Sequence, residues 1–215
     1  MPKANPGGIG EKKINLAMVR PAVRAGKISS PINANNLILA FVLAACVLSL
    51  AVYGEESREH DVGSGPEDWW IGYPDQHSNA GSEVDHPSWA LDPLEEKAAI
   101  ILIHRTGCPA CLKQDEAIRK VLGDLGDDAT YLDVLSDDDF EKAWEGLIVY
   151  YPSGDPSVDP LFVPLTVVLT LVPATDGGAE VAWHSIIGWS GEGSVRSYLN
   201  DAIALYDDNS EGWVR

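Results

Sequence analysis

Over the C-terminal half of the chain, hydrophobic and polar positions follow the periods of strands and helices. A continuous apolar run at 98–104 predicts a buried strand, and apolar residues at helical spacing predict an amphipathic helix over 109–125. Residues 129–135 alternate as a second strand. Ser136 can then cap a helix across 137–150, because a serine hydroxyl accepts a hydrogen bond from the first turn. This stretch therefore predicts strand, helix, strand, helix.

The remaining elements are predicted to be a hairpin and a terminal helix. Residues 163–172 are strongly strand-forming, 174–179 contain an Asp-Gly-Gly turn, and 180–187 continue as the partner strand. A turn at 188–193 precedes an amphipathic helix over 194–206. The first two strands, joined by a crossover helix, should be parallel, and the last two antiparallel. The order predicts an α/β fold, a mixed central sheet flanked by helices on both faces.

An uncharged apolar segment near the N-terminus predicts a single transmembrane helix. Residues 37–53 contain no charged side chain and would extend about 25 Å as a helix. Residues 1–36 carry six Lys and Arg against one Glu, and basic flanks stay in the cytoplasm. We therefore expect a disordered cytoplasmic tail at 1–36, one membrane span, and an extracytoplasmic remainder at the cell membrane.

Two other interpretations of this segment compete with an uncleaved anchor. Small residues at 49–51 and 52–54 fit signal-peptide cleavage sites. The basic region and the apolar run are both longer than in a typical signal peptide, which favours the anchor. Residues 43–46 also resemble a lipoprotein box. However, Cys46 is followed by further apolar residues, which favours a buried cysteine inside a membrane helix.

The composition changes twice between the apolar segment and the first strand. Residues 54–66 are polar and predict a linker, whereas 67–97 mix aromatic residues with Pro, Gly and Asp. We expect the second stretch to pack on the domain as an N-terminal extension, with a short helix near 87–97. The domain itself is predicted to cover 98–208. Five tryptophans are expected to serve packing rather than ligand binding: Trp69, Trp70, Trp89, Trp183 and Trp189.

Charge is divided sharply along the sequence. Residues 54–215 hold 32 of the 33 Asp and Glu but only 9 of the 15 Lys and Arg, a net charge of −23. Such an acidic part argues against nucleic acid or anionic lipid as its partner. It fits basic partners, or solubility and adaptation to salt, and the second interpretation is the simpler one.

The chain has three cysteines, and two of them form its most informative motif. Cys108 and Cys111 flank Pro109 and Ala110 where the first strand gives way to the first helix. The first turn of a helix has unpaired N–H groups and the positive end of the dipole, which stabilise a thiolate. Pro109 fits the first helical position. Cys111 follows on the same face, close enough for a disulfide. This is the arrangement of a thiol–disulfide exchange site.

The element order, with a CxxC motif opening the first helix, resembles the thioredoxin fold. Thioredoxin-like proteins place a cis-proline at the start of the third core strand, facing the two cysteines. Pro164 stands at that place. The Gly-Trp-Ser-Gly turn at 188–191, before the last helix, is also similar to the family pattern. The resemblance covers about half of the chain and implies a thioredoxin-like domain after the transmembrane helix.

Three departures from thioredoxins concern the site. Gly107 precedes the first cysteine, where thioredoxins usually carry Trp. Leu102 falls at the place of the buried Asp that assists proton transfer. The dipeptide Pro109-Ala110 replaces Gly-Pro and is closer to glutaredoxin-like and disulfide-oxidase-like motifs. Because redox poise depends on the relative stability of thiolate and disulfide, the motif leaves open whether the protein is a reductase, an oxidase or an isomerase.

The resemblance implies a membrane-tethered thiol–disulfide oxidoreductase that acts on proteins outside the membrane. Cys108 would be the nucleophile and Cys111 the resolving thiol. Pro164 and the backbone of Val163 would bind the substrate. No cofactor beyond the redox-active disulfide is expected. The partners would be protein thiols or disulfides and a redox partner protein. A static structural disulfide is the alternative, which an exposed extracytoplasmic CxxC disfavours.

Three further alternatives involve other chemistry. His104, four residues before Cys108, could tune the thiolate, although a partly buried histidine without a site is the simpler interpretation. A CxxC pair can also bind Cu(I), with His104 as an added ligand, and His77 and His86 could hold a hard ion. No second cysteine pair or tight histidine spacing supports this, so no metal site is predicted. The last alternative is a non-catalytic interaction module.

Overall fold

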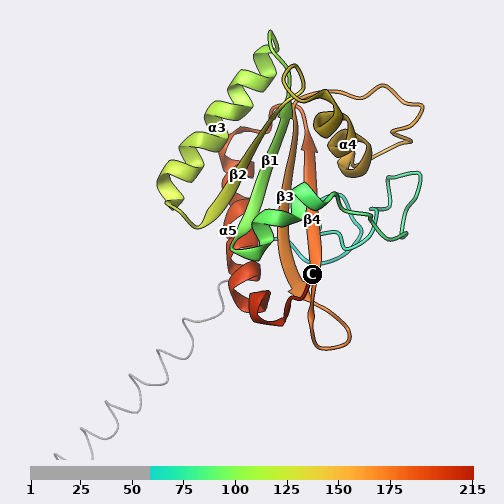
Figure 1. The fold of residues 1–215 in the computed structure, drawn as a ribbon, viewed down its shortest axis with the longest axis vertical. Helices are drawn as coiled ribbons and strands as arrows, with labels where there is room; N and C mark the ends of the chain where they lie inside the picture. The colour runs from blue at the N-terminus through green and yellow to red at the C-terminus, as the bar shows by residue number, and fades with distance from the viewer. Residues whose placement is uncertain (1–58) are drawn as a thin grey trace, which may run out of the picture. The chain divides into compact units, whose positions relative to one another are not determined.

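The computed structural model of the protein describes residues 59–215 (Figure 1). The predicted tail at 1–36, the predicted membrane segment at 37–53, Cys46 and the first part of the predicted linker lie outside the described residues. Within residues 59–215, no helix is long and apolar enough to cross a membrane.

Four strands form one mixed sheet in the order β2-β1-β3-β4 (Figure 1). β1 pairs in parallel with β2, and β3 runs antiparallel to both β1 and β4. The predicted parallel pair and antiparallel hairpin are confirmed, and a mixed sheet with flanking helices fits a thioredoxin-like fold. The strands are β1 (Ala98–His104), β2 (Ala129–Leu135), β3 (Leu165–Pro173) and β4 (Ala179–Ile187).

Helices cover both faces of this sheet, as predicted. α3 (Pro109–Leu125) and α5 (Gly191–Asn209) pack on each other, and α5 crosses β3 and β1. α4 (Phe140–Tyr150) contacts β1 and β2. Neighbouring side chains of β4 point to the two layers. His184 stacks on Tyr198 of α5, whereas the hydroxyl of Ser185 donates to the carbonyl of Tyr150 in α4. The central strand β1 is buried on both faces, which explains its continuous apolar run.

The helix predicted across 137–150 begins three residues later than expected. The carboxylate of Asp139 caps α4 by accepting the N–H of Lys142 at 3.1 Å. Ser136, the predicted cap, lies outside the helix, and its N–H donates to the carbonyl of His104 at 2.8 Å. Asp and Ser cap helices about equally well. Asp139 caps α4 because the backbone bond to His104 holds Ser136 at the end of β1, outside the helix.

The last helix begins earlier than predicted, and the third strand begins later. Ser190 is the N-cap residue of α5, because the turn that precedes the helix is bonded to Gln114 through the Ser190 N–H at 3.0 Å. β3 starts at Leu165 rather than 163, since Pro164 has no N–H to contribute to a strand ladder. A single 3-10 turn, η2 (Ser210–Gly212), follows α5.

The aromatic extension pairs with the outer edge of β4. The backbone N–H groups of Trp70 and Trp183 each donate to the other's carbonyl at 2.9 Å. Trp69, Trp70 and Trp183 are buried and Trp89 is partly buried against the core, which confirms their packing role. The packing role predicted for Trp189 is wrong, because its side chain is 59% exposed. The extension is therefore part of the folded core.

Two further segments attach the N-terminal part of the described chain. The short helix predicted near 87–97 is confirmed as α2 (Ser88–Leu91) followed by the 3-10 turn η1 (Asp92–Glu95). Upstream of it, the backbone N–H groups of Glu59 and His60 donate to the carboxylate of Asp201 in α5. The described part of the predicted linker is thus bonded to the domain.

Candidate active site

Cys108 and Cys111 form a disulfide at the N-terminus of α3, with their Cα atoms 5.2 Å apart. Cys108 is the N-cap residue, and its sulfur accepts the N–H of Cys111 at 3.2 Å. Pro109 occupies the first helical turn, as predicted. The helix thus directs a backbone N–H and its positive dipole end at the sulfur of Cys108. Both would stabilise a thiolate at that atom.

The two cysteines differ in their access to solvent. Cys111 is 0% exposed, whereas Cys108 is partly exposed. A sulfur of another molecule can therefore reach Cys108, while Cys111 is shielded beneath it. This asymmetry supports the prediction that Cys108 is the nucleophile and Cys111 the resolving thiol.

The start of β3 lies against the disulfide. The Val163–Pro164 bond is cis, and the carbonyl oxygen of Val163 lies 3.9 Å from the sulfur of Cys108. The N–H of Gly188 donates to the carbonyl of Pro164 at 2.7 Å, which ties this loop to the end of β4. The structure therefore brings Cys108, Cys111, Val163 and Pro164 together, as the resemblance to thioredoxin-like proteins implied.

The loop that leads into Cys108 is held by two features. Gly107 has a φ of +68°, in the left-handed region that favours glycine. The N–H of Thr106 donates to the carboxylate of Asp137 at 2.7 Å, and this bond lowers the pKa of the Asp137 carboxyl. The sequence assigned Asp137 to the first turn of a helix. It instead anchors the loop before the disulfide, a role that local pattern could not show.

A buried glutamine that the sequence pattern did not single out lies in α3, three residues after Cys111. Gln114 is 0% exposed. Its amide donates to the hydroxyls of Thr166 at 2.9 Å and Ser190 at 3.1 Å, and its oxygen accepts the N–H of Ser190. These bonds join α3, the start of β3 and the start of α5. The sequence did hold one sign of its burial. Gln114 follows Cys111 by three residues and precedes Ile118 by four, so all three lie on one face of the helix.

His104 has another partner than the cysteines. Its Nε2 lies 2.6 Å from the carboxylate of Asp133, which also accepts from Arg119 at 2.9 Å. Asp133 belongs to β2, the edge strand that pairs with β1. The described contacts therefore tie His104 to the β1–β2 pair, and its role in tuning the thiolate stays a prediction.

Three exposed apolar side chains are next in sequence to Cys111, to Val163 and to Gly188, which bonds to Pro164. Leu112 of α3 is 64% exposed, Phe162 of the proline loop 62%, and Trp189 of the turn before α5 59%. The ammonium of Lys113 lies 5.5 Å from the centre of the Trp189 ring. Apolar side chains at these positions give the site a surface suited to apolar segments of another chain.

Among residues 59–215, no three His, Cys, Asp or Glu side chains are arranged to hold a metal ion. The two histidines weighed as hard-ion ligands have other partners. His77 Nδ1 accepts the N–H of Asn79 at 3.0 Å, and His86 Nδ1 lies 3.0 Å from the hydroxyl of Tyr150.

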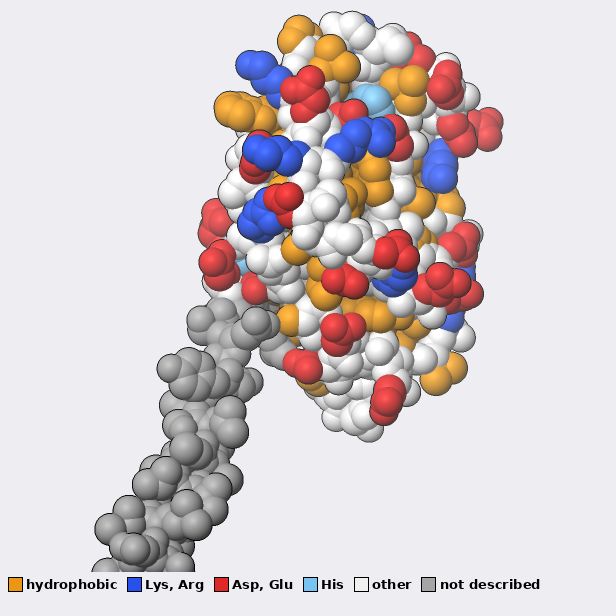
Figure 2. Space-filling model, turned by 90° about the vertical axis from the view of Figure 1, so that its left-hand side faces the viewer, with side chains coloured by type: hydrophobic (Ala, Val, Ile, Leu, Met, Phe, Trp, Pro, Cys, Tyr) orange, Lys and Arg blue, Asp and Glu red, His pale blue; other side chains and the backbone are white. Residues whose placement is uncertain are grey.

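The described part of the chain is strongly acidic. Residues 59–215 contain 30 Asp and Glu against 8 Lys and Arg. On the face shown in Figure 2, acidic side chains are spread between the few basic ones rather than gathered in one patch. Several basic side chains are engaged in ion pairs, such as Lys120 with Glu192 and Arg196 with Asp124. The surface should therefore favour cationic over anionic partners.

Two solved structures resemble this chain. That of chloroplastic thioredoxin z is 11% identical and covers 54% of this chain and 87% of its own, with a TM-score of 0.38. That of a thiol:disulfide interchange protein of the thioredoxin family from Chlorobium tepidum TLS is 14% identical and covers 66% of this chain and 99% of its own, with a TM-score of 0.34. No family model matches the sequence, and no curated protein does. Since both TM-scores are below 0.5, the fold assignment rests on the geometry described above.

Proposed function

We propose that the protein is a thiol–disulfide oxidoreductase that exchanges disulfides with protein substrates through Cys108 and Cys111. The observation that carries this proposal is the placement of the disulfide. Cys108 is partly exposed at a helix N-terminus, Cys111 is buried behind it, and the Val163 carbonyl lies 3.9 Å from the outer sulfur. A structural disulfide needs none of these three features.

In the reducing direction, the reaction begins with the dithiol form. The thiolate of Cys108 attacks one sulfur of a substrate disulfide, so that a Cys108–substrate bond forms and the substrate S–S bond breaks. The other substrate sulfur leaves as a thiolate and takes up a proton. The N–H of Cys111 and the dipole of α3 stabilise the attacking thiolate.

In the second step Cys111 loses its proton and attacks the sulfur of Cys108. The intramolecular disulfide forms, and the second substrate sulfur leaves as a thiolate. Two electrons have then passed from the cysteine pair to the substrate. A redox partner protein with its own dithiol must return the pair to its reduced form. In the oxidising direction both steps run in reverse.

The substrate would be a protein segment laid against the proline loop. The backbone of Val163 lies beside the reacting sulfur. Leu112, Phe162 and Trp189 offer apolar contact around it. Such a surface accepts apolar segments of many sequences, because the backbone contact does not depend on side-chain identity.

The proposed location follows from the sequence alone. Residues 37–53 would anchor the chain in the cell membrane, with the basic residues at 1–36 in the cytoplasm and the exchange site outside. Labelling of Cys108 in intact cells by a membrane-impermeant maleimide, after mild reduction, would test this. Labelling only after the membrane is made permeable would place the site inside.

Trapping of a mixed disulfide tests the proposed chemistry. In the Cys111→Ser variant, Cys108 can still attack a substrate disulfide, but nothing resolves the intermediate. The reduced full-length variant, mixed with insulin, should therefore form a covalent adduct that dithiothreitol releases. Cys108→Ser is the matched control, because it keeps one thiol in the same helical turn.

The proposal requires that the adduct form with Cys111→Ser and be at least about tenfold less abundant with Cys108→Ser, since Cys111 is buried. Equal trapping by both variants would show that the pair has no defined attacking thiol. Absence of an adduct with either variant would contradict the exchange chemistry itself.

A further inference from the structure

The outer edge of β4 is only partly occupied. β4 is the last strand of the sheet, so one side of its backbone has no strand partner. Trp183 directs its N–H and C=O away from β3, because both groups bond to Trp70. Two residues further along, Ser185 and Ile187 share this outward orientation, since backbone groups alternate in direction along a strand. The inward donation of Gly188 N–H to Pro164 confirms the alternation.

The outward backbone groups beyond Trp183 have no partner within the described chain. The structure gives no hydrogen bond to the N–H or C=O of Ser185 or Ile187 on this side, among residues 59–215. Trp70, which pairs at Trp183, leaves the strand after one residue. A second segment could therefore continue the pairing that Trp70 begins.

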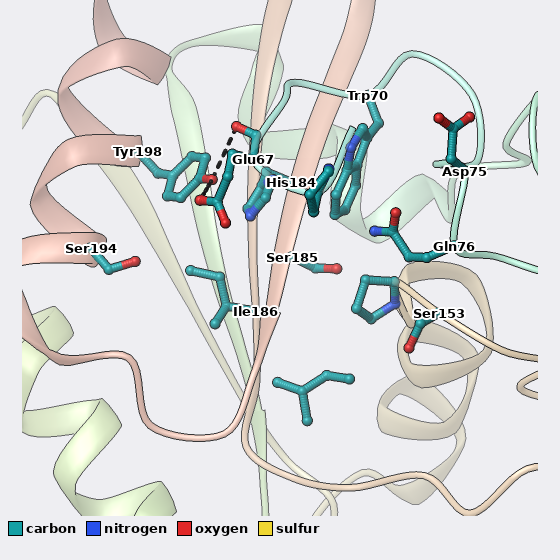
Figure 3. Close-up of a pocket in the computed structure, with 13 residues that line it drawn as sticks. Glu67, Trp70, Asp75, Gln76, Ser153, His184, Ser185, Ile186, Ser194 and Tyr198 are labelled. Carbon is teal, nitrogen blue, oxygen red and sulfur yellow. Dashed lines mark hydrogen bonds between the residues drawn. The ribbon is translucent and has the colours of Figure 1, made fainter. Parts of the chain in front are cut away.

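This open edge forms the floor of a cleft of about 720 Å³, which we name the β4 groove. Its floor is the strand from His184 to Ile187. Figure 3 shows Ser194 and Tyr198 of α5 on one side of this strand, and Gln76 and Ser153 on the other. The edge thus lies at the bottom of a channel between two walls, where His184 and Ser185 are buried and Ile186 and Ile187 are half-buried. Such a channel fits an extended chain.

The charge of the β4 groove selects among extended chains. Glu67 and Asp75 line it, and no Lys or Arg does. Figure 3 shows Glu67 beside Tyr198, whose hydroxyl donates to the Glu67 carboxylate. His184 adds no positive charge at neutral pH, because burial lowers its pKa to about 4. The lining therefore favours a segment with basic side chains.

The β4 groove is continuous with the exchange site. Its last floor residue, Ile187, pairs with Leu165, and Leu165 directly follows Pro164. Adjacent strands lie about 4.8 Å apart. The next residue along β4, Gly188, bonds to the carbonyl of Pro164. A chain that leaves the groove at Ile187 is therefore within a few residues of the sulfur of Cys108.

We propose that an extended, basic segment of the substrate protein binds the β4 groove as an added strand, paired with the backbone of Ser185 and Ile187. The inference rests on the proposed exchange function, and it names the class of substrate: a protein whose disulfide is accompanied by an extended segment rich in Lys or Arg. Backbone pairing supplies the affinity, and the carboxylates of Glu67 and Asp75 supply the selectivity.

Peptide binding to the oxidised full chain tests this directly. The probe is a fluorescein-labelled peptide, Lys-Val-Thr-Val-Lys-Val-Thr, followed by fluorescence anisotropy. Two further versions carry N-methyl groups on alternate residues, either the odd or the even ones. Only one edge of an added strand faces β4. One methylated version should therefore bind like the parent, and the other at least about tenfold more weakly.

Equal affinities of the two methylated peptides would overturn the proposal, because binding would then not use a strand edge. So would absence of binding by the parent peptide at about 1 mM. A version with Glu in place of both Lys should bind at least about tenfold more weakly, and the difference should shrink in the Glu67→Gln variant. A Glu version that binds as well as the Lys version would refute the stated selectivity.

Two proline variants locate the bound peptide on the protein. Ile187→Pro removes an N–H that points away from β3 and so breaks no bond between β3 and β4. Edge strands tolerate proline at such positions. Val181→Pro is the matched control. It also removes an outward N–H of β4, but on the other side of Trp183 from the β4 groove. Ile187→Pro should weaken peptide binding at least about tenfold, whereas Val181→Pro should leave it within about twofold. The same loss in both variants would place the peptide elsewhere.

Peptide binding and insulin trapping test the β4 groove and the exchange function separately. Peptide binding is measured with the oxidised protein and needs no exchange, while insulin trapping by Cys111→Ser needs no groove. Trapping without peptide binding would overturn the β4 groove and leave the exchange function. Peptide binding without trapping would support the groove as a binding site and remove its link to exchange.

Discussion

At the scale of residues, the site depends on two cysteines of the same motif that differ in their exposure to solvent. The helix start places Cys108 outside and Cys111 inside. Residue type and spacing were enough to predict this pair, because a helix start has local rules. The facing Pro164 was expected only from the resemblance to thioredoxin-like proteins. Gln114 and Asp137 could not be assigned in this way. Their roles come from Thr166, Ser190 and Thr106, which are distant in sequence.

The buried amide of Gln114 should be a major contributor to stability around the disulfide. Replacing it with Met keeps the volume but leaves Ser190 N–H and the Thr166 hydroxyl without this partner. We expect Gln114→Met to lower the free energy of unfolding by about 2–4 kcal/mol in urea denaturation. The control, Glu116→Met on the exposed side of α3, should change it by less than about 0.5 kcal/mol. Similar values for both would contradict the role given to Gln114.

Two buried histidines should make the fold sensitive to mild acid. Burial lowers the pKa of His86 and of His184 to about 4, from 6.5 in the unfolded chain. As the pH falls from 6.5 toward 4, the unfolded chain takes up protons that the folded chain does not. The folded state therefore loses stability over this window, by about 2–3 kcal/mol per histidine at pH 4.5, and none above pH 7.

Urea unfolding at pH 7 and pH 4.5 measures this loss. The double variant His86→Gln and His184→Gln should show a much smaller difference between the two pH values, whatever its stability at pH 7. An undiminished difference would assign the acid sensitivity to other groups.

At the scale of elements, the sequence pattern predicted each strand and helix, but several ends were misplaced by two or three residues. α4 had two suitable caps, Ser136 and Asp139, and a backbone bond to β1 decided between them. The start of α5 was misplaced because Ser190 is held by Gln114 of another helix. Local propensity identifies an element, whereas contacts from elsewhere in the fold choose where it ends.

The turn before Cys108 gives a test at this scale. Gly107 has a φ of +68°, while Gly123 lies inside α3, and a Cβ would meet no atom within 4 Å at either position. Only backbone conformation therefore separates the two substitutions. Gly107→Ala should destabilise the fold by about 1–2 kcal/mol. Gly123→Ala should stabilise it by about 0.5–1 kcal/mol. Thermal unfolding measures both, and changes of the same sign would contradict this account of Gly107.

At the scale of the whole molecule, the N-terminal extension completes the core. The sequence predicted the parallel and antiparallel pairs, because connection length limits strand direction. It did not predict that Trp70 would pair with the edge of β4. That contact joins residues more than one hundred positions apart and leaves no local pattern.

Truncation of Trp70 measures how far the fold depends on the extension. Trp70 is 1% exposed, and its ring contacts Trp183 and His184. Trp70→Ala should cost about 3–5 kcal/mol of unfolding free energy, as expected for a buried tryptophan. Trp144→Ala is the control, since Trp144 is 48% exposed, and should cost less than about 1 kcal/mol. A small effect of Trp70→Ala would make the extension an accessory rather than a part of the core.

The central claim is that Cys108 and Cys111 exchange electrons while the domain stays folded. The most direct measurement is the redox equilibrium of this pair in the full chain, by thiol alkylation in graded glutathione buffers with circular dichroism on the same samples. We expect reversible titration with a midpoint between about −270 and −120 mV, the range of thioredoxin-like reductants and disulfide oxidants. The circular dichroism spectrum should be unchanged by reduction. If the pair stays oxidised at about −300 mV, or is reduced only as the protein unfolds, the disulfide is structural and the proposed function is wrong.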